Sequence, residues 1–264
     1  MLSREKRMDL RNSWTFKKTN RMWNDYKFNH AWSISYLNNL CKLSKATTFE
    51  EWESYYLKSG EERKKLLEIL PKRKQEILNK RYYDKDYDIN IEEKEINTMM
   101  GRTMDDLKHI ARLMQTELVK IGIKDIDFNL CLNFVYIRVI DETWIGRQRE
   151  INTVKTLEKI FEDYRFIETS LACDVKYAVD YEINKDNLLI CGIQIKSDVN
   201  YRKIQEGESG ALKTIQTNYS KNKRYIELKK RKVIYVYSTI NGEIVNEDCL
   251  QEIKELADNI SISV

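Results

Sequence analysis

The sequence contains one proline, eight glycines and two histidines among 264 residues. So little proline and glycine leaves few positions for long loops and indicates a high helix content. No stretch approaches 18 consecutive apolar residues, and the opening MLSREKRMDLRNSW has no apolar signal region. We therefore expect a protein that neither spans a membrane nor is secreted.

The cysteines are also few, and their spacing excludes two kinds of site. There are five, an odd number, and no two form a CxxC pair. This predicts neither a disulfide framework nor a zinc site, and it favours a reducing cytoplasm. His30 and His109 have no neighbouring motif, so we expect both to be structural. Walker loops, GxGxxG motifs and nucleophilic Ser or Cys triads are absent, which removes the main rival enzyme classes.

Positive charge is concentrated in two segments. Residues 196–232 hold 11 basic and four acidic side chains, and residues 1–30 hold eight basic and three acidic ones, whereas the whole chain is only +4. The first segment is a predicted basic helix, and the second interleaves aromatic residues with basic and amide side chains. Such segregation suits a polyanion such as nucleic acid. Solvated helix faces and a partly packed N-terminal arm are the alternatives, and composition does not decide between these readings.

The periodicity of apolar residues predicts an α/β (α+β) protein. We expect a mostly helical subdomain over residues 1–125, contacting DNA and packed on a core at 126–264. In the first part, TTFEEWESYYLKSG predicts a helix that ends at Gly60, and residues 130–140 fit both periods but favour a helix. The second part predicts a small mixed sheet flanked by helices. Its predicted helices are 149–164, 209–230 and 246–260, and its predicted strands are 174–183, 187–196 and 232–240.

Three polar residues interrupt the two strands of a predicted hairpin with its turn at 184–187. Asp180 lies in the first strand, and Gln194 and Lys196 lie in the second. Side chains alternate along a strand, so Gln194 and Lys196 share a face, and pairing through the turn brings Asp180 near them. An unpaired buried charge costs several kcal/mol. A cluster of this kind is therefore expected to bind a ligand or to act in catalysis.

The chemistry that suits these groups is metal-assisted hydrolysis of a phosphodiester. Mg²⁺ prefers oxygen ligands, which Asp180 and either the Gln194 amide or the Ile195 carbonyl would supply. Lys196 would orient the attacking water and stabilise the phosphate. Glu150, at the start of the preceding helix, could approach the same metal, although a stabilising first-turn acid is the other interpretation.

At these positions the sequence resembles the PD-(D/E)xK nucleases and, among them, type II restriction endonucleases. The resemblance rests on Asp180, on QIK at residues 194–196, on Glu150 at the helix position and on the nearby Tyr201. It covers residues 146–239. FEEWESYYLKSG, in the helical half, resembles an archaeal-type restriction family that cuts at CTAG.

The motif departs from the family pattern in two places. Val179 stands where a proline often precedes the acid, and Gln194 replaces the more common Glu. A neutral amide is a poorer Mg²⁺ ligand, so Glu150 or Glu182 would supply the second anionic ligand, and the number of metals stays open. Asp174, in a D-x-K pair, is an alternative for the motif acid.

The resemblance implies a restriction-endonuclease-like core and Mg²⁺-dependent cleavage of both DNA strands at a short, palindromic site. It further implies a homodimer and a cognate DNA methyltransferase encoded nearby. The alternatives are a nuclease of the same superfamily without strict specificity and a non-catalytic DNA-binding protein. The residues expected to contact DNA are Arg147, Ser197, Asn200, Tyr201, Lys203, Lys213, Lys221, Lys223 and Arg224.

Overall fold

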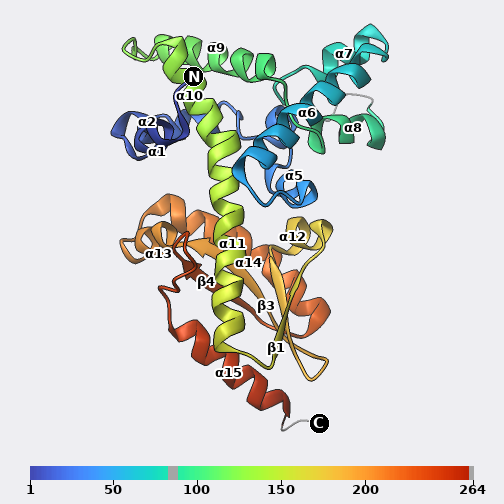
Figure 1. The fold of residues 1–264 in the computed structure, drawn as a ribbon, viewed down its shortest axis with the longest axis vertical. Helices are drawn as coiled ribbons and strands as arrows, with labels where there is room; N and C mark the ends of the chain where they lie inside the picture. Colours follow the sequence, from blue (N-terminus) through green and yellow to red (C-terminus); the bar gives the residue numbers. More distant parts are fainter. Residues whose placement is uncertain (83–88, 262–264) are drawn as a thin grey trace. The chain divides into compact units, whose positions relative to one another are not determined.

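The computed structural model describes residues 1–82 and 89–261, with side chains at all of these positions except 171, 211–214, 260 and 261 (Figure 1). The backbone forms two compact units, Met1–Arg147 and Gln148–Val264. The boundary predicted after residue 125 stays a prediction. In the described ranges, no helix is both long enough and apolar enough to cross a bilayer.

The described residues of the first unit form helices only. The helix that links the two units, α11 (Glu142–Ile160), begins here. The helices before it are α1 (Arg4–Asn12), α2 (Trp14–Lys18), α3 (Asn20–Asp25), α4 (Ala31–Ile34), α5 (Leu37–Ser44), α6 (Phe49–Glu68), α7 (Lys72–Leu78), α8 (Ile91–Thr98), α9 (Met104–Lys120), α10 (Phe128–Tyr136) and the π-helix η1 (Ile137–Asp141).

Helix α6 begins as predicted but does not end at Gly60. The Thr48 hydroxyl accepts from the Glu51 N–H, and the Glu51 carboxylate accepts from the Thr48 N–H, which is a capping box. The helix then continues through Gly60 to Glu68. A Cβ at Gly60 would lie 2.2 Å from the backbone carbon of Arg102. The prediction was wrong because this glycine permits a close backbone approach and does not stop the helix.

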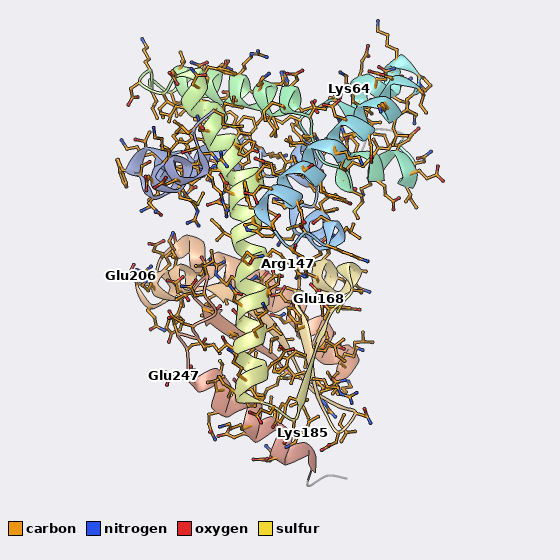
Figure 2. The ribbon with its side chains drawn as sticks, in the orientation of Figure 1. Lys64, Arg147, Glu168, Lys185, Glu206 and Glu247 are labelled. Carbon is orange, nitrogen blue, oxygen red and sulfur yellow. The ribbon has the colours of Figure 1, made fainter. Side chains whose placement is uncertain are left out.

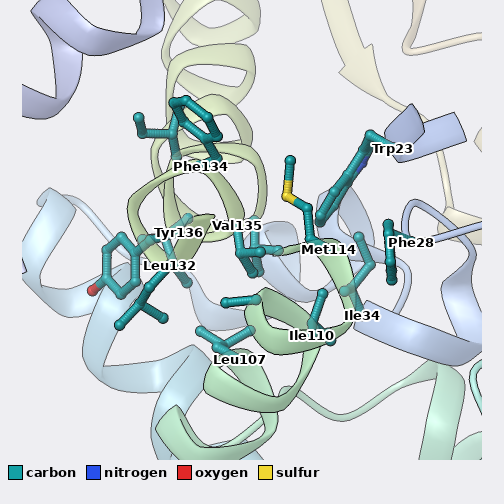
Figure 3. Close-up of a cluster of buried hydrophobic side chains, with 14 of the residues drawn as sticks. Trp23, Phe28, Ile34, Leu107, Ile110, Met114, Leu132, Phe134, Val135 and Tyr136 are labelled. Carbon is teal, nitrogen blue, oxygen red and sulfur yellow. The ribbon is translucent and has the colours of Figure 1, made fainter. Parts of the chain in front are cut away.

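The core of the first unit is formed by residues of α2 to α6 together with α9, α10 and η1, and Figure 3 shows part of it. The predicted helix at 130–140 is confirmed, since α10 continues directly into η1. The N-terminal aromatic residues contribute to this core: Phe16, Trp23 and Phe28 are buried, whereas Trp14 is 71% exposed. Three of these rings therefore pack inside, Tyr26 is half-buried, and Trp14 faces solvent.

The second unit is a four-stranded mixed sheet with helices on both faces, which confirms the predicted fold class. Its strand order is β1-β2-β3-β4, in which β3 and β4 are parallel and the other pairs are antiparallel. After α11 the elements are β1 (Tyr164–Glu168), α12 (Leu171–Tyr177), β2 (Tyr181–Lys185), β3 (Leu188–Ser197), α13 (Asp198–Gln205), α14 (Ser209–Lys229), β4 (Val233–Ser238) and α15 (Asp248–Ser261).

Two features of this unit differ from the prediction. Strand β1 was not predicted, and residues 174–177, expected to be a strand, form the end of α12. Ser170 caps this helix, since its hydroxyl accepts from the Cys173 N–H at 3.3 Å, and Ala178 ends it with φ +55°. Strand β2 therefore begins only at Tyr181. The predicted hairpin is present, and Asp186 and Asn187 form its turn with φ of +50° and +65°, as in a type I′ turn.

The two faces of the sheet have different surroundings (Figure 1). On one face, Ile193 and Ile195 pack with Ile234 and Val236 against apolar residues of α11 and α15. The opposite face carries the alternate residues of β3 and β4, and α13 and α14 lie against it. Residues 190–195 are all buried, so β3 is covered on both faces.

Candidate active site

Asp180 lies at the end of the sheet, one residue before β2. Its carboxylate is buried, and Oδ2 accepts a hydrogen bond of 2.7 Å from the backbone N–H of Ile195. Its own N–H donates to the Ile193 carbonyl at 2.8 Å. The N–H and C=O of one strand residue point to the same neighbour, so the Ile195 carbonyl is directed toward the same edge. In Figure 2, Glu168, the partner of Tyr181 in β1, marks this end of the sheet, and Lys185 marks the other.

Gln194 lies between the two β3 residues that hydrogen-bond Asp180, since the Ile193 carbonyl accepts from the Asp180 N–H and the Ile195 N–H donates to the Asp180 carboxylate. Its side chain is 3% exposed, and its Oε1 has no hydrogen-bond partner within the described chain. A buried acceptor without a partner costs about 1–3 kcal/mol. Such an atom in a native structure calls for an explanation, and a ligand is one of the usual ones.

Lys196 lies two residues further along the same face of β3, paired with Tyr237 of β4. Among the described residues its ammonium makes no ion pair or hydrogen bond, and it borders a cavity of about 120 Å³. The other described residues of the lining are uncharged: Asn200, Ile204, Ile215, Asn218, Tyr235 and Tyr237. A lysine beside such a cavity can hold an anion.

The tyrosines of this cavity are neutral donors at ordinary pH. Burial is the larger cause and the neighbouring Tyr237 the smaller cause that together raise the pKa of Tyr235 to about 12. Burial also raises the pKa of Tyr237. The ring of Tyr201, the tyrosine singled out after the motif, lies 5.1 Å from that of Tyr237. The motif tyrosine thus packs on the strand that adjoins Lys196.

Glu150 is half-exposed in the middle of α11, one turn before a contact between this helix and the sheet. The prediction that it opens the helix was wrong, because α11 already begins at Glu142 and the first-turn acid is that residue. The Thr153 hydroxyl lies 2.6 Å from that of Ser238, which pairs with Ser197 at the end of β3. Helical spacing puts Glu150, Thr153 and the buried Leu157 on one side of α11. Glu150 therefore belongs to the same end of the sheet as Lys196.

The two alternative acids have different surroundings. Glu182 faces α14, where its Oε1 accepts from the Tyr225 hydroxyl at 2.8 Å and lies 3.7 Å from the Lys229 ammonium. Its partner across β3 is Gly192, not Gln194. Asp174 is on helix α12, so it does not occupy the strand position on which that alternative depended.

The predicted DNA-contacting residues are spread over four elements, α11, β3, α13 and α14. Ser197 caps α13, and its hydroxyl accepts from the Asn200 N–H at 3.2 Å. Lys203 pairs with Glu208 at 3.3 Å, and Arg147 is in the part of α11 that belongs to the first unit. The side chain of Lys213 is outside the described set. Three others are on α14, where the side chain of Lys221 is partly exposed and those of Lys223 and Arg224 are exposed.

The sequence analysis missed Asn222, a buried residue on the inner side of α14. Its Nδ2 donates to the carbonyls of Tyr177 and Ala178 at 2.9 and 3.1 Å, and its Oδ1 accepts from the Tyr235 hydroxyl at 2.5 Å. It thus ties the backbone just before Asp180 to the strand beside Gln194. The only signal in the sequence was a single Asn among lysines, three residues before Tyr225.

A family model described as MjaI restriction endonuclease matches residues 19–255. The chain belongs to this family. The match covers both units, and it makes the chain an endonuclease, a hydrolase that acts on DNA. No curated protein and no solved structure matches the chain.

Members of a restriction endonuclease family generally use a divalent cation, and the oxygen atoms at Asp180 fit one. The described residues contain no group of three or more His, Cys, Asp or Glu side chains that could hold a metal. Hard cations, however, also accept carbonyl and amide oxygens, water and substrate phosphate as ligands. The Asp180 carboxylate, the partnerless Gln194 Oε1 and the Ile195 carbonyl form a mixed set of this kind.

Proposed function

We propose that the chain is a type II restriction endonuclease that hydrolyses both strands of duplex DNA at a short palindromic site with Mg²⁺, leaving 5′-phosphates. One observation carries this proposal. Gln194 has a buried amide oxygen without a partner in the described chain, next to the residue whose N–H holds a buried carboxylate and two residues from a lysine that borders a cavity. A protein that only bound DNA would have no need to bury this combination.

Asp180 and Gln194 would hold the cation, with the Ile195 carbonyl and Glu150 as further ligands. A bound divalent cation would supply a Lewis acid that polarises the phosphoryl oxygen and acidifies water. Lys196 would place its ammonium on the scissile phosphate and orient the attacking water. Burial of Asp180 and Gln194 keeps both side chains in position and limits competing water.

The finer features of the function follow from the same proposal. Cutting both strands of a palindrome requires two active sites related by a twofold axis, so the enzyme would act as a homodimer. The likeness of residues 49–60 to a family that cuts at CTAG supports CTAG as the site. A host would then need a DNA methyltransferase that protects this sequence, encoded nearby.

Cleavage of plasmid DNA with Mg²⁺ tests the proposal. Wild-type protein should convert a plasmid that contains CTAG sites into discrete fragments, and a plasmid without them should stay intact. Lys196→Ala should lower the rate by roughly 100-fold or more while binding to a labelled duplex is kept. Lys254→Ala, an exposed lysine on α15 that belongs to neither the site nor the predicted DNA contacts, is the matched control for loss of charge.

Two results would contradict the proposal. Discrete cutting by Lys196→Ala at the wild-type rate would exclude the site built on this lysine. A smear of fragments, in place of bands, would favour the nonspecific nuclease.

A further inference from the structure

A second cavity, in the helical unit, has a strongly positive lining. Its volume is about 110 Å³, and its charged residues are Arg63, Lys80, Arg81, Arg102 and Asp106. Among the described residues that line it, four are cations and one is a carboxylate, and His109 also borders the space. None of these residues belongs to the candidate active site.

Arg63 enters this cavity from α6 with an incompletely bonded guanidinium. The residue is 3% exposed, and its Nε and Nη2 donate to Asn97 Oδ1 at 2.9 and 2.7 Å. Its Nη1 makes no hydrogen bond in the described chain, and the nearest carboxylate oxygen, Asp106 Oδ2, is 4.0 Å away. A buried donor therefore remains available to a ligand.

Arg102 is equally buried, and its partners are all neutral. Its Nη1 donates to Ser35 Oγ and to the Met100 and Gly101 carbonyls, and its Nη2 donates to the Trp32 and Asn97 carbonyls. Burial, reinforced by the charge of Arg63, lowers the pKa of Arg102 to about 9. The bonds satisfy its N–H groups, but they leave its charge uncompensated.

Asp106 does not offset both cations, because it already has another role. Its Oδ2 accepts from the Thr103 N–H and from the Thr103 hydroxyl, each at 2.9 Å, and so caps α9. The two other buried arginines of the described chain have closer compensation. Arg7 forms an ion pair with the buried Asp141 at 2.7 Å, and Arg138 lies 4.1 Å from the centre of the Phe16 ring.

We propose that this cavity binds a phosphate group, from a DNA phosphodiester or from a free phosphate. A tetrahedral anion has acceptors in several directions, which suits guanidinium donors from two different segments. The volume is somewhat below the roughly 150 Å³ that admits a benzene ring, so it takes a phosphate group but not a nucleoside. Lys80 and Arg81 at the cavity add positive charge. The site does not depend on the proposed nuclease mechanism.

Thermal unfolding of the full chain without Mg²⁺ tests this site. Sodium phosphate should raise the Tm more than sodium chloride at the same ionic strength. Asp106→Asn keeps an acceptor for the Thr103 cap and removes the opposing charge, so it should strengthen phosphate binding several-fold. Asp105→Asn, one residue earlier and exposed, is the matched control and should leave binding unchanged.

The double variant Lys80→Gln, Arg81→Gln should weaken phosphate binding roughly tenfold, the effect of losing about 1.4 kcal/mol. Lys72→Gln, Arg73→Gln, an exposed pair on α7 that does not line the cavity, removes the same charge and should have no effect. Each shift is taken relative to the variant's own Tm without phosphate, so a change in basal stability does not enter. The core arginines stay intact, which keeps the fold.

Binding of a labelled DNA duplex distinguishes the two sources of phosphate. If free phosphate competes with the duplex for the wild type but not for the Lys80→Gln, Arg81→Gln variant, the ligand of the cavity is a phosphodiester of DNA. If phosphate binds to the cavity but does not compete with the duplex, the ligand is a free phosphate. The proposal is overturned if phosphate stabilises no better than chloride, or if all four variants respond as the wild type does. Neither result bears on Lys196 or on cleavage.

Discussion

The carboxylate of Asp180 accepts a hydrogen bond from the backbone N–H of Ile195 at 2.7 Å. This bond closes the end of the β2–β3 hairpin, where the backbone of β2 has only just begun. It fixes the carboxylate next to the residue that links Gln194 and Lys196. A structural bond and a proposed metal ligand therefore share one carboxylate, and substitutions can separate the two roles.

Asp180→Asn and Asp180→Ala should differ in stability but not in activity. Asn keeps an oxygen that can accept from Ile195, whereas Ala leaves this N–H buried without a partner, which costs about 1–3 kcal/mol more. Both lose the negative charge, so both should cleave plasmid DNA at least roughly 100-fold more slowly. Urea unfolding and a nicking assay measure the two effects. An Asn variant that cleaves normally would exclude Asp180 as an anionic ligand.

Gln194 should lower the stability of the metal-free protein. Gln194→Leu removes an amide oxygen that has no partner, so its free energy of unfolding should be equal to that of the wild type or about 1 kcal/mol higher. Its cleavage should nevertheless fall, because an oxygen ligand is lost. Gln194→Glu should bind Mg²⁺ more tightly and gain more Tm from it than the wild type does. A Leu variant that is strongly destabilised would show that the amide has a structural role.

The hairpin and its polar residues could be predicted because each signal is local. Asp186-Asn187 is a turn dipeptide between two β-rich runs, and alternation along one strand places Gln194 and Lys196 on one face. Strand β1 and helix α12 could not be predicted in this way. The segment Asp174–Tyr177 is too short for its strand-like pattern to be decisive. It is helical because the Ser170 hydroxyl caps the helix that begins just before it.

Contacts between residues far apart in the sequence could not be predicted either, because the signals in the sequence are local. Gly60 reads as a helix stop until the backbone of Arg102, over 40 positions later, is seen to pack on it. The partners of Asn222 in α12 are likewise some 45 positions away in the chain. Local periodicity carries no information about such contacts.

Asn222 should position the segment that precedes Asp180. Asn222→Ala removes three hydrogen bonds among buried groups and should lower the free energy of unfolding by about 2–3 kcal/mol. A misplaced carboxylate should reduce kcat while the affinity for DNA, measured without Mg²⁺, is unchanged. Lys254→Ala, an exposed residue on α15 outside the predicted DNA contacts, is the control. Loss of stability with an unaltered kcat would limit Asn222 to a structural role.

Tyr235 should make the protein less stable in strong alkali. Burial raises its pKa to about 12, above the value of about 10 for an unfolded tyrosine. The unfolded state thus loses its proton first, so the contribution is complete below pH ~10 and is lost as the pH rises toward 12. Tyr235→Phe should have a shallower loss of stability between these pH values in urea unfolding. An unchanged slope would contradict the assignment.

Glu150 and Glu182 should respond differently to removal of their charge. Glu182 is engaged by Tyr225 and Lys229 and faces Gly192, so Glu182→Gln should cleave at nearly the wild-type rate. Glu150 is on the sheet side of α11 at the Lys196 end, so Glu150→Gln should require a higher Mg²⁺ concentration for half-maximal cleavage. A Mg²⁺ titration of cleavage by both variants compares the two acids directly. A shifted requirement in Glu182→Gln alone would transfer the second anionic ligand to β2 and leave Glu150 as a half-exposed acid in the middle of α11.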